Sequence, residues 1–432
     1  MEVQGIETQR LALGREAVEY ISDRLAEPEW LREHRLRAWE TFERTPMPSL
    51  QDEEWRRTDI RRLKLDRFSL PVEAGAVYEP ESSRDHRSGF MQVVDGFATK
   101  TELDPSAARQ GVILTTISEA ALAYPELVRR HLGGLVSAEY GKFAALGNAL
   151  GTGVFLYVPK DAQIELPIQL STTVSAGGSA VFPRTLVIAE RYASVTLIDR
   201  WYSQTQEAES LSSGVVEVFT GEGAQVRYVG VQEYGRNVWS FQAQRHQVSR
   251  DAQNNNLNIG LGARLAKANV EAFMQEQGGS CEMLGLYFGD ETQLFDYHTL
   301  QDHFAPSCMS DLLYKGVLRD RSRAVFSGLI RVEPGSQKTD AYQTNRNLLL
   351  SETSRADSIP NLEIGANDVK CSHGASVGPL DKEHLFYLMA RGLSRRDAER
   401  MIVDGFFEPL VSRIPLEGVR ERLQEAIDQK MD

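Results

Sequence analysis

The segment Val187-Ile-Ala-Glu-Arg-Tyr-Ala193-Ser-Val195-Thr-Leu197 carries a pattern that recurs along the middle of the chain. The same pattern centres on Ala162 and on Ala224, so the three alanines stand 31 residues apart. An apolar residue precedes each alanine by six positions, and two more follow it by two and four: Leu156, Ile164 and Leu166; Val187, Val195 and Leu197; Val218, Val226 and Tyr228. Each unit predicts a strand, a tight turn ending in a small residue, and a second alternating strand.

A repeat of a few tens of residues built from short strands is typical of stacked coils, in which each coil buries its apolar face on the next. Weaker copies of the pattern follow around Ala252 and Gly279. An immunoglobulin-like sandwich would also show alternating strands, but it would not keep one phase at three successive corners. We therefore predict a mainly β protein with a right-handed β-helix core, flanked by helical domains at both ends.

Helical patterns precede the repeat. Apolar residues recur at helical spacing from Arg15 to about Arg44, where Pro46 and Pro48 end the pattern. A second helical stretch is expected over residues 116–150, with Ser118 as a weak cap. The part of the chain up to about residue 150 is thus predicted to be mostly helical.

Helical patterns also follow the repeat. Asp381 is placed to cap a helix that ends at Gly392, and Ser394 to cap a second helix that runs to about Gly405. A third helix is expected from Pro415, with Leu416, Val419, Leu423 and Ile427 on one stripe. The predicted organisation is an N-terminal mostly helical region over 1–150, a β-helix core over 151–378 and a C-terminal helical docking domain over 379–432.

Charge and cysteine content argue against several classes of protein. The 432 residues include 48 Lys and Arg against 61 Asp and Glu, a net charge of −13. Nucleic acids and anionic membranes attract clustered Lys and Arg, so neither is expected as the main partner. The three cysteines, Cys281, Cys308 and Cys371, are widely spaced, as is usual in a reducing compartment. Because no apolar run is long enough to cross a membrane, we expect a cytoplasmic protein.

The most informative chemical feature lies near the C-terminus, where Cys371 and His373 flank Ser372. On a strand the thiol and the imidazole face one side and Ser372 faces the other. The two positions on the shared face lie roughly 7 Å apart, so both side chains are within reach of one metal or cluster. Tetrahedral zinc and iron-sulfur clusters take about four protein ligands, and the chain has no Cys-x-x-Cys to supply the rest. Either another chain completes the site, or the pair is a buried thiol and a hydrogen-bonded core histidine.

Other candidate sites are weaker. His298, His303 and Cys308 follow at five-residue intervals, which places neighbours on opposite faces of a strand and disfavours a shared metal. The segment Gly335-Ser-Gln-Lys-Thr339 lacks the glycine spacing of a phosphate loop, so no ATP hydrolysis is expected. A β-helix carbohydrate lyase or hydrolase would need paired carboxylates. The nearest acidic cluster comprises Asp290, Glu291, Asp296 and Asp302.

Four segments together resemble the SufB/SufD family of iron-sulfur cluster assembly scaffold proteins. They are Gln337-Lys-Thr-Asp-Ala-Tyr-Gln-Thr-Asn-Arg-Asn-Leu-Leu-Leu350, Asp368-Val-Lys-Cys-Ser-His-Gly-Ala375, Phe386-Tyr-Leu-Met-Ala-Arg-Gly-Leu393 and Gly405-Phe406. The resemblance covers essentially residues 140–410 and is weaker in the helical front end. Gly374 stands where the SufB branch shows a glutamate, and no cysteine occurs between Asn347 and Asp368. The chain therefore resembles the SufD branch.

The resemblance implies a non-catalytic scaffold subunit of the SUF assembly complex. It implies pairing with a SufB-like subunit through the β-helix ends, and a SufC-like ATPase bound by the C-terminal helices through Phe386, Tyr387, Arg391, Gly392 and Phe406. Cys371 and His373 would contribute ligands to a transient iron-sulfur cluster at the subunit interface, with no cofactor held permanently by this chain alone. A homodimer is possible in isolation, because β-helix ends expose unpaired strand edges. A purely structural adaptor for the ATPase is the alternative.

Overall fold

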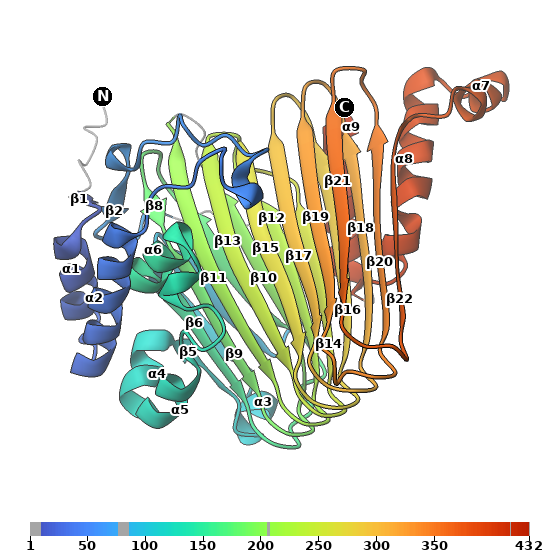
Figure 1. The fold of residues 1–432 in the computed structure, drawn as a ribbon. Coiled ribbons are helices and arrows are strands. Elements are labelled where there is room, and N and C mark those ends of the chain that lie inside the picture. Colours follow the sequence, from blue (N-terminus) through green and yellow to red (C-terminus); the bar gives the residue numbers. More distant parts are fainter. Residues whose placement is uncertain (1–9, 77–85, 205–207, 415, 432) are drawn as a thin grey trace, which may run out of the picture.

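The computed structural model describes residues 10–76, 86–204, 208–414 and 416–431. Two large sheets of mostly parallel strands face each other and are joined strand by strand at their corners, forming a β-solenoid of about eight coils (Figure 1). Helices pack against the outside of this body at both ends of the chain. The predicted β-helix core with flanking helices is confirmed.

Successive strands alternate between the two sheets. One sheet has the spatial order β22 (Lys370–Pro379), β20 (Asp340–Leu349), β18 (Met309–Leu318), β16 (Ser280–Gly289), β14 (Gln253–Gly260), β12 (Gln225–Glu233), β10 (Ser194–Ser203), β7 (Ile168–Val174), β3 (Gly89–Val94) and β4 (Phe97–Leu103). The other has the order β21 (Arg355–Ile364), β19 (Arg323–Val332), β17 (Leu294–His303), β15 (Leu265–Met274), β13 (Val238–Val248), β11 (Ser210–Thr220), β9 (Pro183–Ala189), β6 (Thr152–Val158) and β5 (Ile113–Thr116), with β8 (Ala180–Val181) beside β11.

The corner predicted from the alanine repeat is a continuous row of small residues. The backbone N–H of Ser194 donates a hydrogen bond to the backbone carbonyl oxygen of Ala162. Gln225 donates in the same way to Ala193 and Gln253 to Ala224, at 2.8 Å in each case. The row continues through Ala252, Gly279, Cys308 and Thr339, each accepting a hydrogen bond from the next coil. Small side chains are needed here because coils stack at the spacing of paired strands. After Ala224 the spacing of the row varies between 27 and 31 residues, which is why the later repeats are weaker in sequence.

The N-terminal helices cover one end of the solenoid. α1 (Arg15–Arg24) and α2 (Glu29–Arg44) form two helices where the sequence pattern runs from Arg15 to Arg44, and Pro28 separates them. With α6 (Lys142–Leu150) they share a core with the outer face of β11, β13 and β15. The remaining helical elements of this region are η1 (Glu53–Trp55), η2 (Leu65–Arg67), α3 (Pro105–Arg109), α4 (Ile117–Ala123), α5 (Pro125–His131) and η4 (Ala138–Tyr140).

The first 150 residues also supply strands. β3, β4 and β5 extend the two large sheets, and β1 (Arg10–Ala12) pairs with β2 (Ser69–Pro71). The expected cap at Ser118 is wrong. Thr116 caps α4 instead, because its side chain accepts from the backbone of Glu119 while the Glu119 carboxylate accepts from the Thr116 backbone.

Three helices end the chain. α7 (Lys382–Ala390) is capped by Asp381 and α8 (Arg395–Val411) by Ser394, as predicted. α8 does not stop near Gly405 but continues to Val411. α9 (Glu417–Met431) buries the predicted residues Val419, Leu423 and Ile427, whereas Pro415 lies outside the described residues. α8 and α9 pack on the outer face of the sheet that contains β16 and β18.

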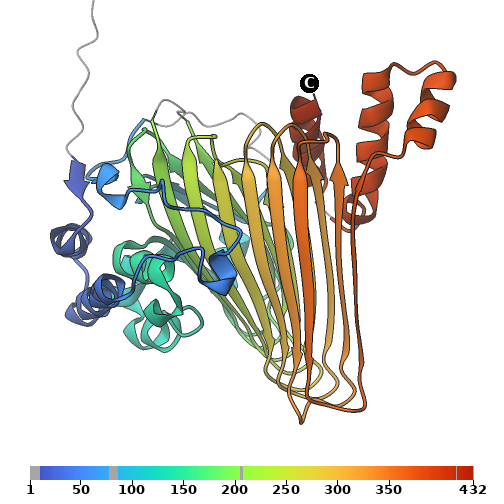
Figure 2. The same ribbon diagram turned by 45° about the horizontal axis from the view of Figure 1, so that its top comes forward.

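Strands β21 and β22 form the last coil and are the terminal strands of the two sheets (Figure 2). Each pairs on one side only within the described chain, β21 with β19 and β22 with β20. Most residues of both strands are exposed or half-buried, whereas β18 is almost entirely buried. The C-terminal end of the solenoid is therefore open. Among the described residues no helix is long and apolar enough to span a membrane.

Candidate functional site at the open end of the solenoid

Cys371 and His373 lie on β22, in the open coil. β22 pairs in parallel with β20, which places Cys371 beside Ala341 and His373 beside Gln343. Ala341 and Gln343 are buried inside the solenoid, so the two paired positions of β22 also face its interior. Ser372 pairs with Tyr342, which is 44% exposed and faces outward. The predicted sharing of one face by Cys371 and His373 is thus seen in the strand register.

The position of the coil decides how accessible the two side chains are. At the same positions one coil earlier, Ala341 and Gln343 are buried because the last coil covers them. No strand pairs with the outer edge of β22 in the described chain, so Cys371 is only half-buried and His373 is exposed. The thiol and the imidazole therefore lie on the rim of the solenoid, where another molecule can reach them.

Cys371 is attached to the core on one side. It packs on a small apolar cluster formed by Ile330, Val332, Ala341 and Ala366. Partial burial raises the pKa of the Cys371 thiol, and the nearby Asp340 carboxylate raises it further. The free thiol is therefore protonated at neutral pH, and binding of a metal would have to displace that proton.

Cys371 and His373 are two potential metal ligands on the rim. Within the described residues, no group of three or more His, Cys, Asp or Glu side chains is placed to hold a metal ion. One thiolate and one imidazole are suitable ligands for iron or zinc, but a closed site takes about four. Cys371 and His373 alone would therefore not complete such a site.

Apolar side chains are also exposed on the last coil. Leu362, Ile364 and Val377, from the two strands of the last coil, are all exposed, Val377 by 43%. Together with the unpaired edges of β21 and β22, they form a surface that a further coil or a second solenoid could extend.

Comparison with known proteins gives a consistent family assignment. Residues 172–406 match the family described as SUF system FeS cluster assembly, SufBD core domain, and residues 5–170 match the SufBD protein N-terminal region. The chain belongs to the SufBD family. It is 29% identical to the iron-sulfur cluster assembly protein SufD of Bacillus subtilis, over 98% of this chain and 99% of that protein. It is 27% identical to a SufBD family protein of Staphylococcus saprophyticus, over 93% of this chain and 89% of that protein.

The candidate docking residues of this SufBD chain are divided between solvent and the β body. Phe386 and Tyr387 are 74% and 57% exposed, and α7 has no buried residue. Arg391 lies over the Tyr387 ring at 5.2 Å, and Gly392 ends the segment with a φ of +99°, which favours glycine. Phe406 instead packs against the solenoid, where its backbone carbonyl accepts a hydrogen bond from Lys315.

α7 therefore projects from the body as an exposed apolar element (Figure 1). Helical spacing predicts that Met389 and Met401 line an internal seam together with Leu385, Leu388, Ala398 and Ile402, but both methionines are exposed. Ala398 alone of that predicted seam is fully buried. The seam was mispredicted because α7 makes few contacts beyond α8, so helical periodicity alone did not show which face is covered.

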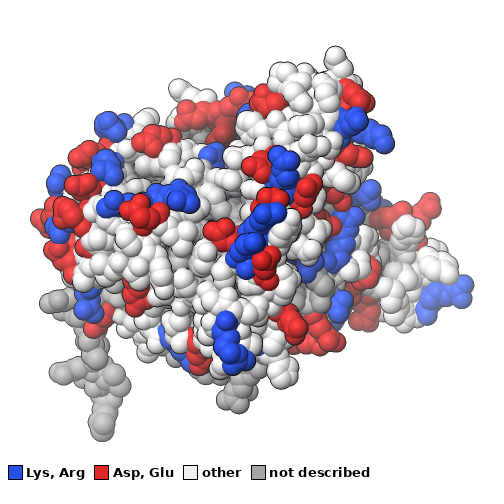
Figure 3. Space-filling model, turned by 90° about the horizontal axis from the view of Figure 1, so that it is seen from below, with Lys and Arg blue, Asp and Glu red and all other residues white. Residues whose placement is uncertain are grey.

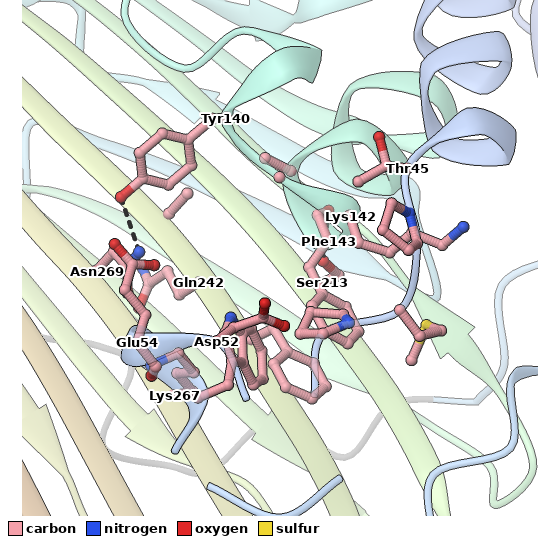
Figure 4. A pocket seen from close by; sticks show the side chains of 18 of the residues that line it. Thr45, Asp52, Glu54, Tyr140, Lys142, Phe143, Ser213, Gln242, Lys267 and Asn269 are labelled. Carbon is pink, nitrogen blue, oxygen red and sulfur yellow. Dashed lines mark hydrogen bonds between the residues drawn. The ribbon is translucent and has the colours of Figure 1, made fainter. Parts of the chain in front are cut away.

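A cavity of about 420 Å³ lies far from the rim, outside β11, β13 and β15, and sequence reasoning did not identify it (Figure 4). Trp55, Phe143 and Phe241 line it, the two phenylalanine rings stacked at 3.6 Å. Several of its polar groups are already engaged: Lys267 with Asp296, Asn269 with the Tyr140 hydroxyl and Lys142 with the Phe42 carbonyl. A ligand would find few free polar partners there, so this cavity is a poor candidate for a specific site.

The other candidate residues of the SufBD chain lie in separate structural environments. His298 faces outward beside Asp296. His303 is buried in the interior, where its Nε2 and the Ser310 hydroxyl share a hydrogen bond of 2.8 Å. Cys281 lies in the hydrophobic core, and Cys308 is a corner residue. Of the acidic residues, Asp290 pairs with Arg236, Asp296 with Lys267 and Asp302 with Arg331. Each of these three carboxylates pairs with a different cation, which does not favour a carbohydrate-cleaving pair.

The surface carries charges of both signs. On the face seen in Figure 3, Lys and Arg side chains are interspersed with Asp and Glu side chains. Such mixing does not favour binding of a polyanion to this face.

Proposed function

We propose that this SufBD chain is a scaffold subunit that contributes Cys371 and His373 to a nascent iron-sulfur cluster shared with a second subunit. The cluster is cargo, assembled at the rim and passed on, and this chain holds no cofactor of its own. The single observation that carries the proposal is the position of the thiol and the imidazole, side by side on the open coil of an otherwise closed solenoid.

The open coil supports completion of the site by another protein. A solenoid end that met only water would be expected to carry charged or covered edges, because bare edges promote aggregation. Here both edge strands are ten residues long, and the rim carries exposed Leu362, Ile364 and Val377. A SufB-like subunit with the same architecture could pair with these edges and bring the remaining ligands. In the absence of that subunit, a second copy of this chain could occupy the same edges.

The two ligands also suit a site that must release what it builds. Because each of the two subunits would supply half of the ligands, a small relative motion of the subunits would open the site. The C-terminal helices would supply the link to a SufC-like ATPase, with exposed Phe386 and Tyr387 of α7 as the contact. Arg391 and Gly392 would terminate α7, and Phe406 would hold α8 against the solenoid.

The proposal is tested by anaerobic co-purification of the chain with its SufB-like and SufC-like partners, followed by measurement of bound iron and sulfide. Cys371→Ala and His373→Ala should each lower the iron content of the complex while leaving its subunit composition unchanged. Ser372→Ala, which alters the side chain between them on the opposite face, is the matched control and should retain iron. A purely structural adaptor would keep its full iron content in all three variants.

A further inference from the structure

Gln343 lies one coil below His373 and carries an unused hydrogen-bond acceptor. The two residues are paired in register on β20 and β22, at the strand spacing of about 4.8 Å. Gln343 is fully buried. Its Nε2 donates to the Gly328 carbonyl oxygen at 3.4 Å, whereas its Oε1 has no hydrogen-bond partner in the described chain.

The opposite sheet makes room for this carboxamide. Gly328 lies on β19, across the interior, and a side-chain carbon at that position would stand 2.4 Å from the Gln343 Oε1. Every other side chain at residue 328 would therefore displace the amide. The Gln343 amide therefore occupies the space that the absent side chain of Gly328 leaves open.

A buried acceptor without a partner costs free energy, so its presence directly below a candidate ligand calls for an explanation. An imidazole that ligates a metal through one nitrogen carries a proton on the other, and that N–H is usually held by a carbonyl or carboxylate oxygen. The next unpartnered acceptor of this kind below the rim is Oε1 of Gln301. It lies on β17, which β19 separates from the rim strand β21, whereas Gln343 lies on the strand that pairs directly with β22 and in register with His373.

We propose that Gln343 is a positioning residue for His373. Its Oε1 accepts a hydrogen bond from the free ring N–H of His373 when the other ring nitrogen binds iron, which fixes the tautomer and the aim of the ring. The inference rests on the proposed ligand role of His373. It adds that the preceding coil orients His373: Gln343 accepts the hydrogen bond, and Gly328 leaves the space that the Gln343 amide occupies.

The test is Co(II) binding to the full-length chain under anaerobic conditions, followed by the thiolate-to-cobalt absorption band and the ligand-field bands. Gln343→Leu keeps a similar volume but removes the acceptor, and should weaken Co(II) binding about 10-fold and shift the ligand-field bands. Gln343→Glu keeps the acceptor and should bind within about threefold of the unmodified chain. Gln244→Leu removes a buried glutamine of β13, remote from the rim, and should change neither quantity.

The outcomes separate this inference from the proposed function. If His373→Ala weakens Co(II) binding while Gln343→Leu leaves the affinity and the spectrum unchanged, His373 is a ligand and Gln343 does not position it. If His373→Ala itself binds Co(II) like the unmodified chain, the ligand role of His373 is wrong and the role of Gln343 is wrong with it. Gly328→Ala provides a second variant: it leaves Gln343 in the sequence but displaces its amide, and should reproduce the effect of Gln343→Leu.

Discussion

Ala341 and Cys371 are paired in register on consecutive coils, yet Ala341 is buried and Cys371 is half exposed. The difference arises because the coil that contains Cys371 has no coil above it. Residues that face the core elsewhere in the solenoid face the rim here. The proposed function follows from this one change of environment.

The rim should mediate association. Val377→Lys places a charge among the exposed apolar side chains of the last coil and should weaken self-association of the isolated chain and its binding to a SufB-like subunit. Sedimentation velocity over a range of concentrations measures this directly. Leu122→Lys is the matched control, because Leu122 is also an exposed apolar residue but lies on α4, at the other end of the molecule. If both variants self-associate as strongly as the unmodified chain does, the rim is not an interface.

Thiol reactivity should single out Cys371. Cys281 and Cys308 are buried, whereas Cys371 is partly accessible. Iodoacetamide should therefore label the folded chain at Cys371 only. Because burial and Asp340 raise the pKa of this thiol, labelling should be slow at pH 7 and should accelerate up to and beyond pH 9. Mass spectrometry of the labelled peptides checks both points, and labelling of Cys281 at a comparable rate would contradict the described packing.

The buried ion pair between Lys267 and Asp296 should matter for stability. Their side-chain atoms lie 2.7 Å apart, and Thr58 donates to the same carboxylate, which holds the segment around residue 58 on the sheet. Lys267→Met leaves Asp296 buried without its cation and should lower the free energy of unfolding by about 3–5 kcal/mol. Urea denaturation measures the change. Arg61→Met breaks the exposed pair with Asp59 and should leave the urea midpoint unaltered.

Asp296 should keep this contribution far into the acid range. Burial alone would raise its pKa, but Lys267 and His298 outweigh burial and hold the pKa well below its usual value. A carboxyl with a lowered folded-state pKa stabilises the fold above the unfolded-state pKa and loses that contribution only as pH falls through the folded-state pKa. The unmodified chain should thus keep this contribution equally at pH 5 and at pH 8. In Lys267→Met burial raises the pKa of Asp296, so the carboxyl can take up a proton and the penalty should be smaller at pH 5 than at pH 8.

Asp199 should have the opposite pH dependence. It is buried inside the solenoid, where burial raises its pKa to about 7 although Thr185 and Tyr228 both donate to it. The stability that this carboxyl contributes is complete below its unfolded-state pKa of about 4 and is lost as pH rises to about 7. Asp199→Asn mimics the protonated form, so it should be more stable than the unmodified chain by roughly 2–4 kcal/mol at pH 8, with little difference at pH 4. A constant difference across this range would contradict the assignment.

The sequence predicted the solenoid because one structural requirement repeats at every coil. A corner residue must be small, and Ala162, Ala193 and Ala224 meet that requirement at constant spacing. The later corners of the same row are filled by Gly279, Cys308 and Thr339, where coils differ in length, so sequence alone showed them only weakly. The alternation of Cys371, Ser372 and His373 was likewise visible, because strand geometry fixes which side chains share a face.

Features that depend on what covers a surface were not predictable in the same way. Met389 and Met401 have helical spacing suited to a seam, but their exposure depends on how far α7 stands from the body. Gln343 lies in a segment that sequence analysis quoted only as a family motif. Its position below His373 follows from strand register across a coil, which no local pattern reports. The cavity at Trp55 also required residues from five distant segments to be brought together.

The most direct test of the central claim is pulsed electron-nuclear spectroscopy of the reduced cluster in the co-purified complex, with ¹⁵N-histidine incorporated only into this chain. If His373 is a ligand, the spectrum should contain a ¹⁵N coupling of the strength typical of directly bound imidazole, and His373→Asn should remove it. A spectrum without ¹⁵N coupling from a complex that carries a full complement of iron would show that this chain does not ligate the cluster through His373.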